Sequence, residues 1–126
     1  MENAKSSEDL FVWKKAYKFT LAVYHTTKSF PKAEKYELVS QFRRAAVSVI
    51  ANIAEGFRKL SKADKLRFYN IAQGSLSECR CYVILSHDLN CCDTTELLVS
   101  VQEVSKLLDS YCMSIHDSLS HPKSLV

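Results

Sequence analysis

Glycine and proline are scarce in this sequence, with two of each among 126 residues. Because all-β domains need many turn residues, this scarcity disfavours strands and favours long helices. No apolar run approaches the roughly 20 residues that a membrane-spanning helix needs, so we expect no membrane segment. The first residues lack the apolar stretch and the small-residue cleavage pattern of a secretion signal, so the cytoplasm is the expected location.

The number of cysteines and the distribution of charge along the chain are also informative. The five cysteines are an odd number, and in a reducing compartment we expect buried thiols or free thiols rather than a disulfide framework. Residues 1–41 carry 7 basic and 5 acidic side chains, residues 42–80 carry 8 and 3, and residues 81–126 carry 2 and 6. The net charge of +3 therefore conceals a basic middle segment and an acidic last segment.

Stop signals and apolar periodicity predict four helices, over residues 8–29, 32–58, 62–89 and 94–119, followed by a short tail at 120–126. Three pairs have the spacing of N-terminal capping boxes: Ser6 with Asp9, Ser61 with Asp64, and Asp93 with Glu96. Phe30-Pro31 ends the first helix. Because short turns force long helices to run antiparallel, residues 1–126 are predicted to form one all-α domain, an up-down-up-down antiparallel four-helix bundle.

The first helix has more apolar surface than one core needs. One stripe consists of Leu10, Trp13, Tyr17, Leu21 and Tyr24. A second stripe, roughly 180° away on a helical wheel, consists of Val12, Ala16, Phe19 and Val23. A helix that is apolar on opposite sides has two partners, so we expect the second stripe to contact another copy of the chain. The alternative is that a long side chain or the C-terminal tail covers it.

Several segments resemble those of a known family. They are Asp9-Leu10, Val12-Trp13 and Ala16; Phe30-Pro31; Gln41, Arg43-Arg44-Ala45-Ala46 and Ser48; Asn52-Ile53-Ala54-Glu55-Gly56; and Phe68, Ala72, Gly74-Ser75 and Glu78. Over residues 9–90 the chain resembles the 23S ribosomal RNA intervening-sequence proteins, whose relatives include the accessory variability determinants of diversity-generating retroelements. The resemblance implies a four-helix bundle, a homopentamer, no enzymatic activity, and an association with nucleic acid or with a protein partner such as a reverse transcriptase. The chain departs from the family at Glu37, Ile50 and Cys79-Arg80-Cys81.

The basic middle segment supplies the candidate nucleic-acid contacts. These are Arg43, Arg44, Arg58, Lys59, Lys62, Lys65 and Arg67. Nucleic-acid phosphates need clustered cations, and an oligomer would multiply such a cluster. The alternative interpretation is a solvated helix end, because a modest net charge is weak support for nucleic-acid binding.

A polar stripe also runs along the second predicted helix, at spacings of three and four residues. Its members are Gln41, Arg44, Ser48, Asn52 and Glu55. We assign them to the subunit interface. They form either a hydrated or subunit-facing surface with Arg44 and Glu55 in ion pairs, or the lining of a channel through an oligomer.

Metal binding and catalysis lack supporting residues. His87 with Cys91, and Cys112 with His116, are each one helical turn apart, but the two pairs should lie roughly 27 Å from each other, too far to share one ion. Neither a phosphate-binding glycine loop nor a nucleophile elbow is present, so no catalytic residue, metal or cofactor is expected. An enzyme would require a pocket formed between subunits.

The sequence therefore predicts a non-enzymatic homo-oligomeric bundle that associates with RNA through a basic surface. It could serve as an accessory to a nucleic-acid-processing protein. The rival prediction is a purely structural or protein-binding assembly without nucleic acid.

Overall fold

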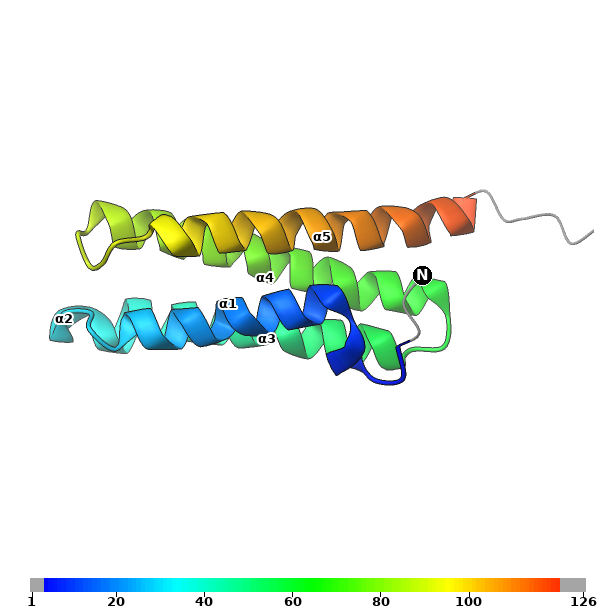
Figure 1. Ribbon diagram of the computed structural model, residues 1–126, viewed down its shortest axis with the longest axis horizontal. Helices are drawn as coiled ribbons and strands as arrows, with labels where there is room; N and C mark the ends of the chain where they lie inside the picture. The colour runs from blue at the N-terminus through cyan, green and yellow to red at the C-terminus, as the bar shows by residue number, and fades with distance from the viewer. Residues whose placement is uncertain (1–3, 121–126) are drawn as a thin grey trace, which may run out of the picture.

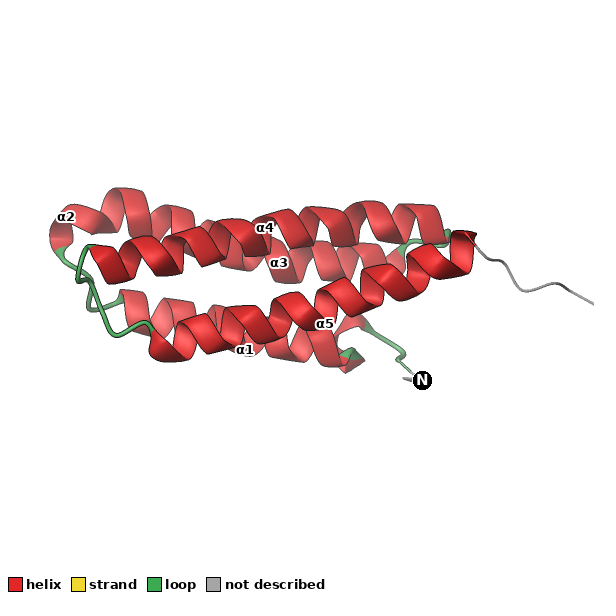
Figure 2. Ribbon diagram, turned by 90° about the horizontal axis from the view of Figure 1, so that it is seen from above, coloured by secondary structure: helices red, strands yellow, loops and turns green. Residues whose placement is uncertain are grey.

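The computed structural model describes residues 4–120 and is helical throughout, with no strand in that range (Figures 1 and 2). The long helices are α1 (Phe11–Thr27), α3 (Ser40–Arg58), α4 (Lys62–Asp88) and α5 (Thr95–Ser120). Between and before them lie a 3₁₀ turn (Ser7–Asp9), the short α2 (Lys32–Glu34) and a π-helical segment (Lys35–Val39). The all-α prediction is confirmed, with four long helices. Of the predicted tail at 120–126, Ser120 ends α5 and the rest lies outside the described residues.

The first predicted helix begins later than its capping box suggested. The Asp9 carboxylate accepts the backbone N–H groups of Lys5 (3.0 Å) and Ser6 (3.2 Å), but this pattern closes only the 3₁₀ turn. Leu10 then adopts an extended conformation (φ −71°, ψ 132°) and buries its side chain. α1 therefore starts at Phe11 rather than at residue 8, because burying Leu10 interrupts the helical backbone.

The second predicted helix, 32–58, divides into α2, the π-helical segment and α3. The wider π-helical turn brings two consecutive residues, Leu38 and Val39, into a small apolar cluster with Phe30. Cys91 and Cys92 from the α4–α5 connection pack against the same cluster. These contacts close one end of the molecule, away from the α3–α4 turn.

Local hydrogen bonds mark the start of α4, the end of α4 and the start of α5. The Ser61 hydroxyl accepts the Asp64 N–H (3.1 Å) at the start of α4, as its spacing predicted. α4 ends in a Schellman motif, in which Asn90 takes a positive φ of 56° and the Cys91 N–H donates to the Ser86 carbonyl (2.9 Å). Asp93 precedes α5, and its carboxylate accepts the Thr95 N–H (3.0 Å) and hydroxyl (2.7 Å). These hydrogen bonds define both ends of α4 and the start of α5.

The long helices pack side by side along their lengths, α3 against α1 and α4, and α5 against α4 and α1 (Figures 1 and 2). Their inner faces form a single main core, whose largest fully buried side chains include Phe19, Phe42, Ile53, Leu76 and Leu108. None of the described helices combines the length and the apolar character that a bilayer crossing requires.

One of the two glycines allows a close approach between helices. Gly74, in the middle of α4, is exposed, and a Cβ there would meet no atom within 4 Å. Gly56 is buried instead, and a Cβ on it would lie 2.5 Å from Cε1 of Tyr69. The Tyr69 ring therefore packs on the α3 backbone only because residue 56 lacks a side chain.

Candidate functional site

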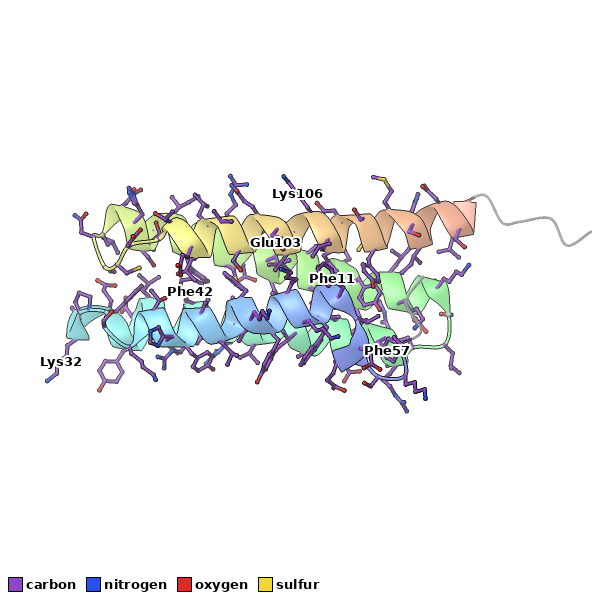
Figure 3. All side chains as sticks on the ribbon, viewed as in Figure 1. Phe11, Lys32, Phe42, Phe57, Glu103 and Lys106 are labelled. Carbon is purple, nitrogen blue, oxygen red and sulfur yellow. The ribbon has the colours of Figure 1, made fainter. Side chains whose placement is uncertain are left out.

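The seven candidate nucleic-acid contacts do not form one surface. Arg43 and Arg44 lie in the first half of α3, whereas the other five surround the α3–α4 turn: Arg58, Lys59, Lys62, Lys65 and Arg67. Arg58 follows Arg43 by fifteen positions, which corresponds to about 22 Å along a helix. The turn lies at an end of the elongated molecule, next to Phe57 and near the C-terminal end of α5 (Figures 1 and 3). We call this end, defined by the five cations, the basic end.

Several cations of the basic end are already engaged within the chain. Lys59 lies 3.8 Å from the Glu55 carboxylate, and Arg67 lies 3.6 Å from that of Asp64. Both cations also stand over the Phe68 ring, at 4.8 and 5.1 Å from its centroid. These contacts are solvent-exposed and weak, so they leave both side chains able to turn toward a phosphate.

Lys65 has a structural role that the sequence did not reveal. Its ammonium group donates to the carbonyls of Phe57 (2.7 Å) and Gly56 (3.3 Å), the last turn of α3. Partial burial lowers the pKa of Lys65, because removal from water disfavours the charged form. Lys65 caps a helix C-terminus, where unpaired carbonyls attract cations, and is not a free phosphate contact.

Arg58 and Lys62 are the exposed cations that flank the tip of the turn. Lys62 donates to the Ser118 hydroxyl near the end of α5, and no described carboxylate forms an ion pair with either cation. Between them, Leu60 is fully exposed (100%). The basic end therefore presents two uncompensated charges beside an uncovered apolar side chain.

The predicted subunit stripe on the first helix must be corrected. Val12, Ala16, Phe19 and Val23 are 0–1% exposed and belong to the chain's own core. They leave no surface for a second copy. The same inner face carries Thr20 and Thr27, whose hydroxyls donate to the carbonyls of Ala16 (2.9 Å) and Val23 (2.7 Å).

The other apolar stripe, apart from the buried Leu10 at its start, faces outward instead. Tyr17, Leu21 and Tyr24 are 41%, 52% and 39% exposed, and the Trp13 ring stacks on that of Tyr17 at 5.0 Å. Val47 of α3 adds another exposed apolar side chain. We call Trp13, Tyr17, Leu21 and Tyr24 the outer stripe. α1 is apolar on two sides, as predicted. The stripe that we assigned to a second copy faces the core, and the outer stripe faces away from it.

Part of the polar stripe on α3 is satisfied within the chain. The Ser48 and Ser75 hydroxyls share a hydrogen bond (2.8 Å) between α3 and α4, and the Asn52 amide donates to the Ser48 carbonyl (2.8 Å) and hydroxyl (3.1 Å). Gln41, Arg44 and Glu55 are exposed. Of the two expected ion pairs, Glu55 forms one, with Lys59, whereas Arg44 forms none with the described residues.

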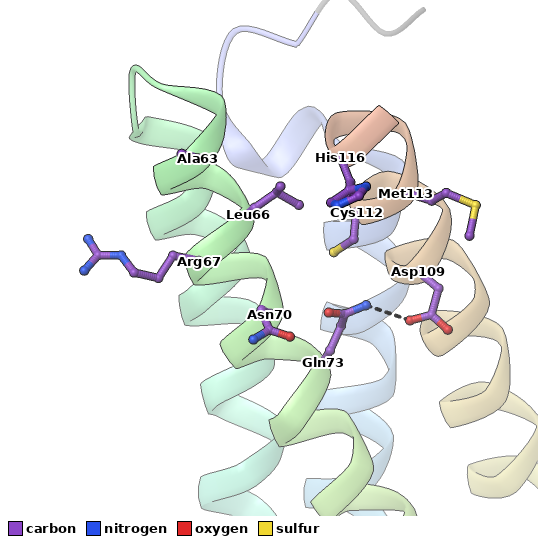
Figure 4. Close-up of a pocket in the computed structure, with 9 residues that line it drawn as sticks. All are labelled: Ala63, Leu66, Arg67, Asn70, Gln73, Asp109, Cys112, Met113 and His116. Carbon is purple, nitrogen blue, oxygen red and sulfur yellow. Dashed lines mark hydrogen bonds between the residues drawn. The ribbon is translucent and has the colours of Figure 1, made fainter. Parts of the chain in front are cut away.

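A groove of about 640 Å³ lies between α4 and α5 near the basic end. Figure 4 shows Leu66, Cys112 and His116 pointing into it, with a hydrogen bond from the Gln73 amide to the Asp109 carboxylate (2.9 Å) at its lower end. Burial raises the pKa of the Cys112 thiol to about 11, so this thiol stays protonated at neutral pH and is a poor nucleophile. Among residues 4–120, no three histidine, cysteine or acidic side chains come together in a way that could hold a metal ion.

Comparison with known proteins now identifies the family. The model of the 23S rRNA-intervening sequence protein family matches residues 8–110. The chain belongs to this family. A crystal structure of a protein with unknown function from the S23 ribosomal protein family of Bacteroides thetaiotaomicron is 24% identical, with a TM-score of 0.75 over 81% of this chain and 95% of that one. It supports the fold alone. No curated protein is found to match this chain.

Proposed function

We propose that this member of the 23S rRNA-intervening sequence protein family is a non-enzymatic, homo-oligomeric, up-down-up-down antiparallel four-helix bundle that associates with RNA through its basic end. The family resemblance suggests a homopentamer and an accessory role beside a nucleic-acid-processing protein such as a reverse transcriptase. We further propose a cytoplasmic location. The observation that carries the proposal is the outer stripe, an apolar surface that residues 4–120 leave uncovered.

Contacts between the helices support the bundle topology. Thr20 reaches the Ala46 carbonyl while the later Thr27 contacts the earlier Arg43, as expected of antiparallel α1 and α3. Lys62 meets Ser118 while Gln73 meets Asp109, as expected of antiparallel α4 and α5. Short connections between long helices favour this arrangement.

Self-association through the outer stripe has a direct test. Replacing the half-exposed Leu21 by aspartate places a charge in the centre of the stripe, so we expect Leu21→Asp to dissociate the assembly while the monomer stays folded. Val99→Asp on α5 is the matched control, because Val99 is equally aliphatic and more exposed (61%). Light scattering should report a smaller particle for the first variant only. A monomeric wild-type protein at micromolar concentration would remove the basis for the assembly.

RNA binding is tested at the basic end. The triple variant Arg58→Glu, Lys59→Glu, Lys62→Glu should weaken binding to a structured RNA and flatten the dependence of affinity on salt concentration, since fewer counterions are released. The control, Lys32→Glu, Arg80→Glu, Lys106→Glu, has the same change in charge at exposed positions away from the turn (Lys32 and Lys106 in Figure 3). A gel shift at physiological salt compares them. If wild type gives no shift, the chain is a structural or protein-binding assembly instead.

A further inference from the structure

The two arginines that the fold separates from the basic end line a pocket of their own. It measures about 480 Å³, a volume within the range of small-molecule sites. Its walls are Tyr24 of α1, Val39 at the end of the π-helical segment, and Ser40, Arg43, Arg44 and Val47 of α3.

Arg43 is fixed in place before any ligand arrives. Its Nε donates to the Thr27 hydroxyl (2.9 Å), and one terminal nitrogen donates to the Tyr24 carbonyl (3.2 Å). The guanidinium also lies over the Tyr24 ring, 4.7 Å from its centroid. An arginine has five N–H donors, so most of them remain for a ligand, and the side chain loses little entropy on binding because it is already ordered.

The charge of the pocket specifies an anion. Both charged side chains that line it are arginines, and no described carboxylate forms an ion pair with either of them. Two positive charges match a phosphate monoester, which carries nearly two negative charges at neutral pH and offers three acceptor oxygens. The planar fork of arginine binds such oxygens in pairs.

The remaining wall specifies what the phosphate is attached to. Val39, Val47 and the ring of Tyr24 offer an apolar surface next to the arginines, against which a flat ring can pack. An inorganic ion would leave this apolar surface exposed to water. A phosphate with a heterocyclic base uses both parts of the pocket.

We propose that the pocket between α1 and the first half of α3 binds a nucleoside monophosphate, with the phosphate on Arg43 and Arg44 and the base against Val39, Val47 and Tyr24. The same chemistry is present in a free nucleotide and in the 5′-phosphorylated end of an RNA strand. The site is distinct from the basic end and does not depend on it.

Calorimetric titration with AMP tests the site on the full chain. AMP should bind, and Arg44→Gln should weaken it by about tenfold or more, since charge-assisted hydrogen bonds are lost. Arg44 is exposed and forms no hydrogen bond or ion pair with the described residues, so this variant should unfold like wild type. Arg58→Gln, the same change on the same helix at the basic end, should bind AMP normally. No detectable binding at millimolar AMP, or equal affinity in the Arg44 variant, would overturn the proposal.

Smaller probes separate the two halves of the ligand. Adenosine lacks the phosphate and inorganic phosphate lacks the base, so each should bind at least about tenfold more weakly than AMP. If inorganic phosphate binds as tightly as AMP, the pocket is not a nucleotide site. Val47→Asp, which adds a negative charge to an exposed position on the wall, should abolish AMP binding by repulsion, and unchanged affinity would contradict the assigned pose.

Two further experiments identify the source of the nucleotide and test whether a second copy of the chain contributes to the pocket. Displacement of AMP by a 5′-phosphorylated RNA but not by its 5′-hydroxyl counterpart identifies the strand end, whereas displacement by neither identifies the free nucleotide. Leu21→Asp should retain AMP affinity whether or not it dissociates the assembly. Loss of AMP binding in a folded Leu21→Asp monomer would mean that another subunit completes the pocket, and the single-chain site would be wrong.

Discussion

At the scale of single residues, the two glycines make opposite contributions to stability. A methyl group at Gly56 would lie 2.5 and 2.7 Å from two carbons of the Tyr69 ring, and that ring is 4% exposed and has little room to move. Gly56→Ala should therefore lower the free energy of unfolding by about 1–3 kcal/mol through overpacking. Gly74→Ala meets no atom and should raise it by about 0.5–1 kcal/mol, since alanine has the higher helix propensity.

Urea denaturation followed by circular dichroism measures both glycine variants. Each is the control for the other, because the substitution is identical and only the surroundings differ. A loss of stability in Gly74→Ala would indicate that the open face of α4 is occupied by another molecule in solution. A neutral Gly56→Ala would mean that Tyr69 can leave the α3 backbone without cost.

Two buried residues predict how stability depends on alkaline pH. Burial raises the pKa of Tyr69 from 10.0 to about 12 and that of Cys79 from 9.0 to about 12. Above pH 9 the unfolded chain releases these protons while the folded chain retains them, so the unfolded state gains free energy of ionisation and stability falls. Their contribution is complete below pH 9 and is lost as the pH approaches 12.

Single variants show how much of the loss of stability at alkaline pH is due to Tyr69 and how much to Cys79. In chemical denaturation between pH 8 and 11, Cys79→Ala should remove part of the decline that begins near pH 9, and Tyr69→Phe the part that begins near pH 10. Cys81→Ala, the same substitution at an exposed position of α4, is the control for the change of side chain itself. A wild-type profile that is flat up to pH 11 would contradict the burial of both groups.

At the scale of the helix, α1 shows what distinguishes an inner face from an outer one. Phe19→Ala should cost about 3–5 kcal/mol of folding stability, because Phe19 is fully buried in the core. Leu21→Ala, two residues away on the half-exposed outer stripe, should change the unfolding of the monomer by less than about 0.5 kcal/mol. Thermal unfolding at low protein concentration compares them, and a similar loss in both would mean that the outer stripe is buried in the monomer.

The sequence located the helices well because their ends are set by local chemistry. Ser61 starts α4 at Lys62, as predicted, and the predicted end of the second helix at residue 58 coincides with the end of α3. The inner face of α1 was not predictable in this way. Both stripes have the same helical period, and only the positions of α3 and α5 decide which one is covered. The hydrogen bonds of Lys65 to α3 carbonyls could not be predicted from the sequence either, since they depend on how tightly the α3–α4 turn closes.

At the scale of the whole molecule, the positive charges occur at separated places. The basic end lies at the α3–α4 turn, Arg43 and Arg44 line a pocket farther along α3, and the last segment, which contains α5, is acidic overall. The basic end of a single copy therefore offers an RNA only a few clustered cations. Exposed cation–phosphate contacts are individually weak and are screened by salt. Strong binding to RNA would then require the basic ends of several copies to contact one RNA.

The proposed function therefore predicts that assembly and RNA affinity are coupled. If copies associate side by side through the outer stripe and point the same way, their basic ends gather at one rim, and each further tip binds with a high effective concentration. Leu21→Asp alters no cation, yet we expect it to reduce RNA affinity by about a hundredfold and to reduce the slope of log affinity against log salt, because fewer phosphates are neutralised together. Fluorescence anisotropy with a labelled structured RNA, at several salt concentrations, measures both quantities, with Val99→Asp as the charge-matched control. A dissociated Leu21→Asp that keeps the wild-type affinity and slope would show that each copy binds RNA alone.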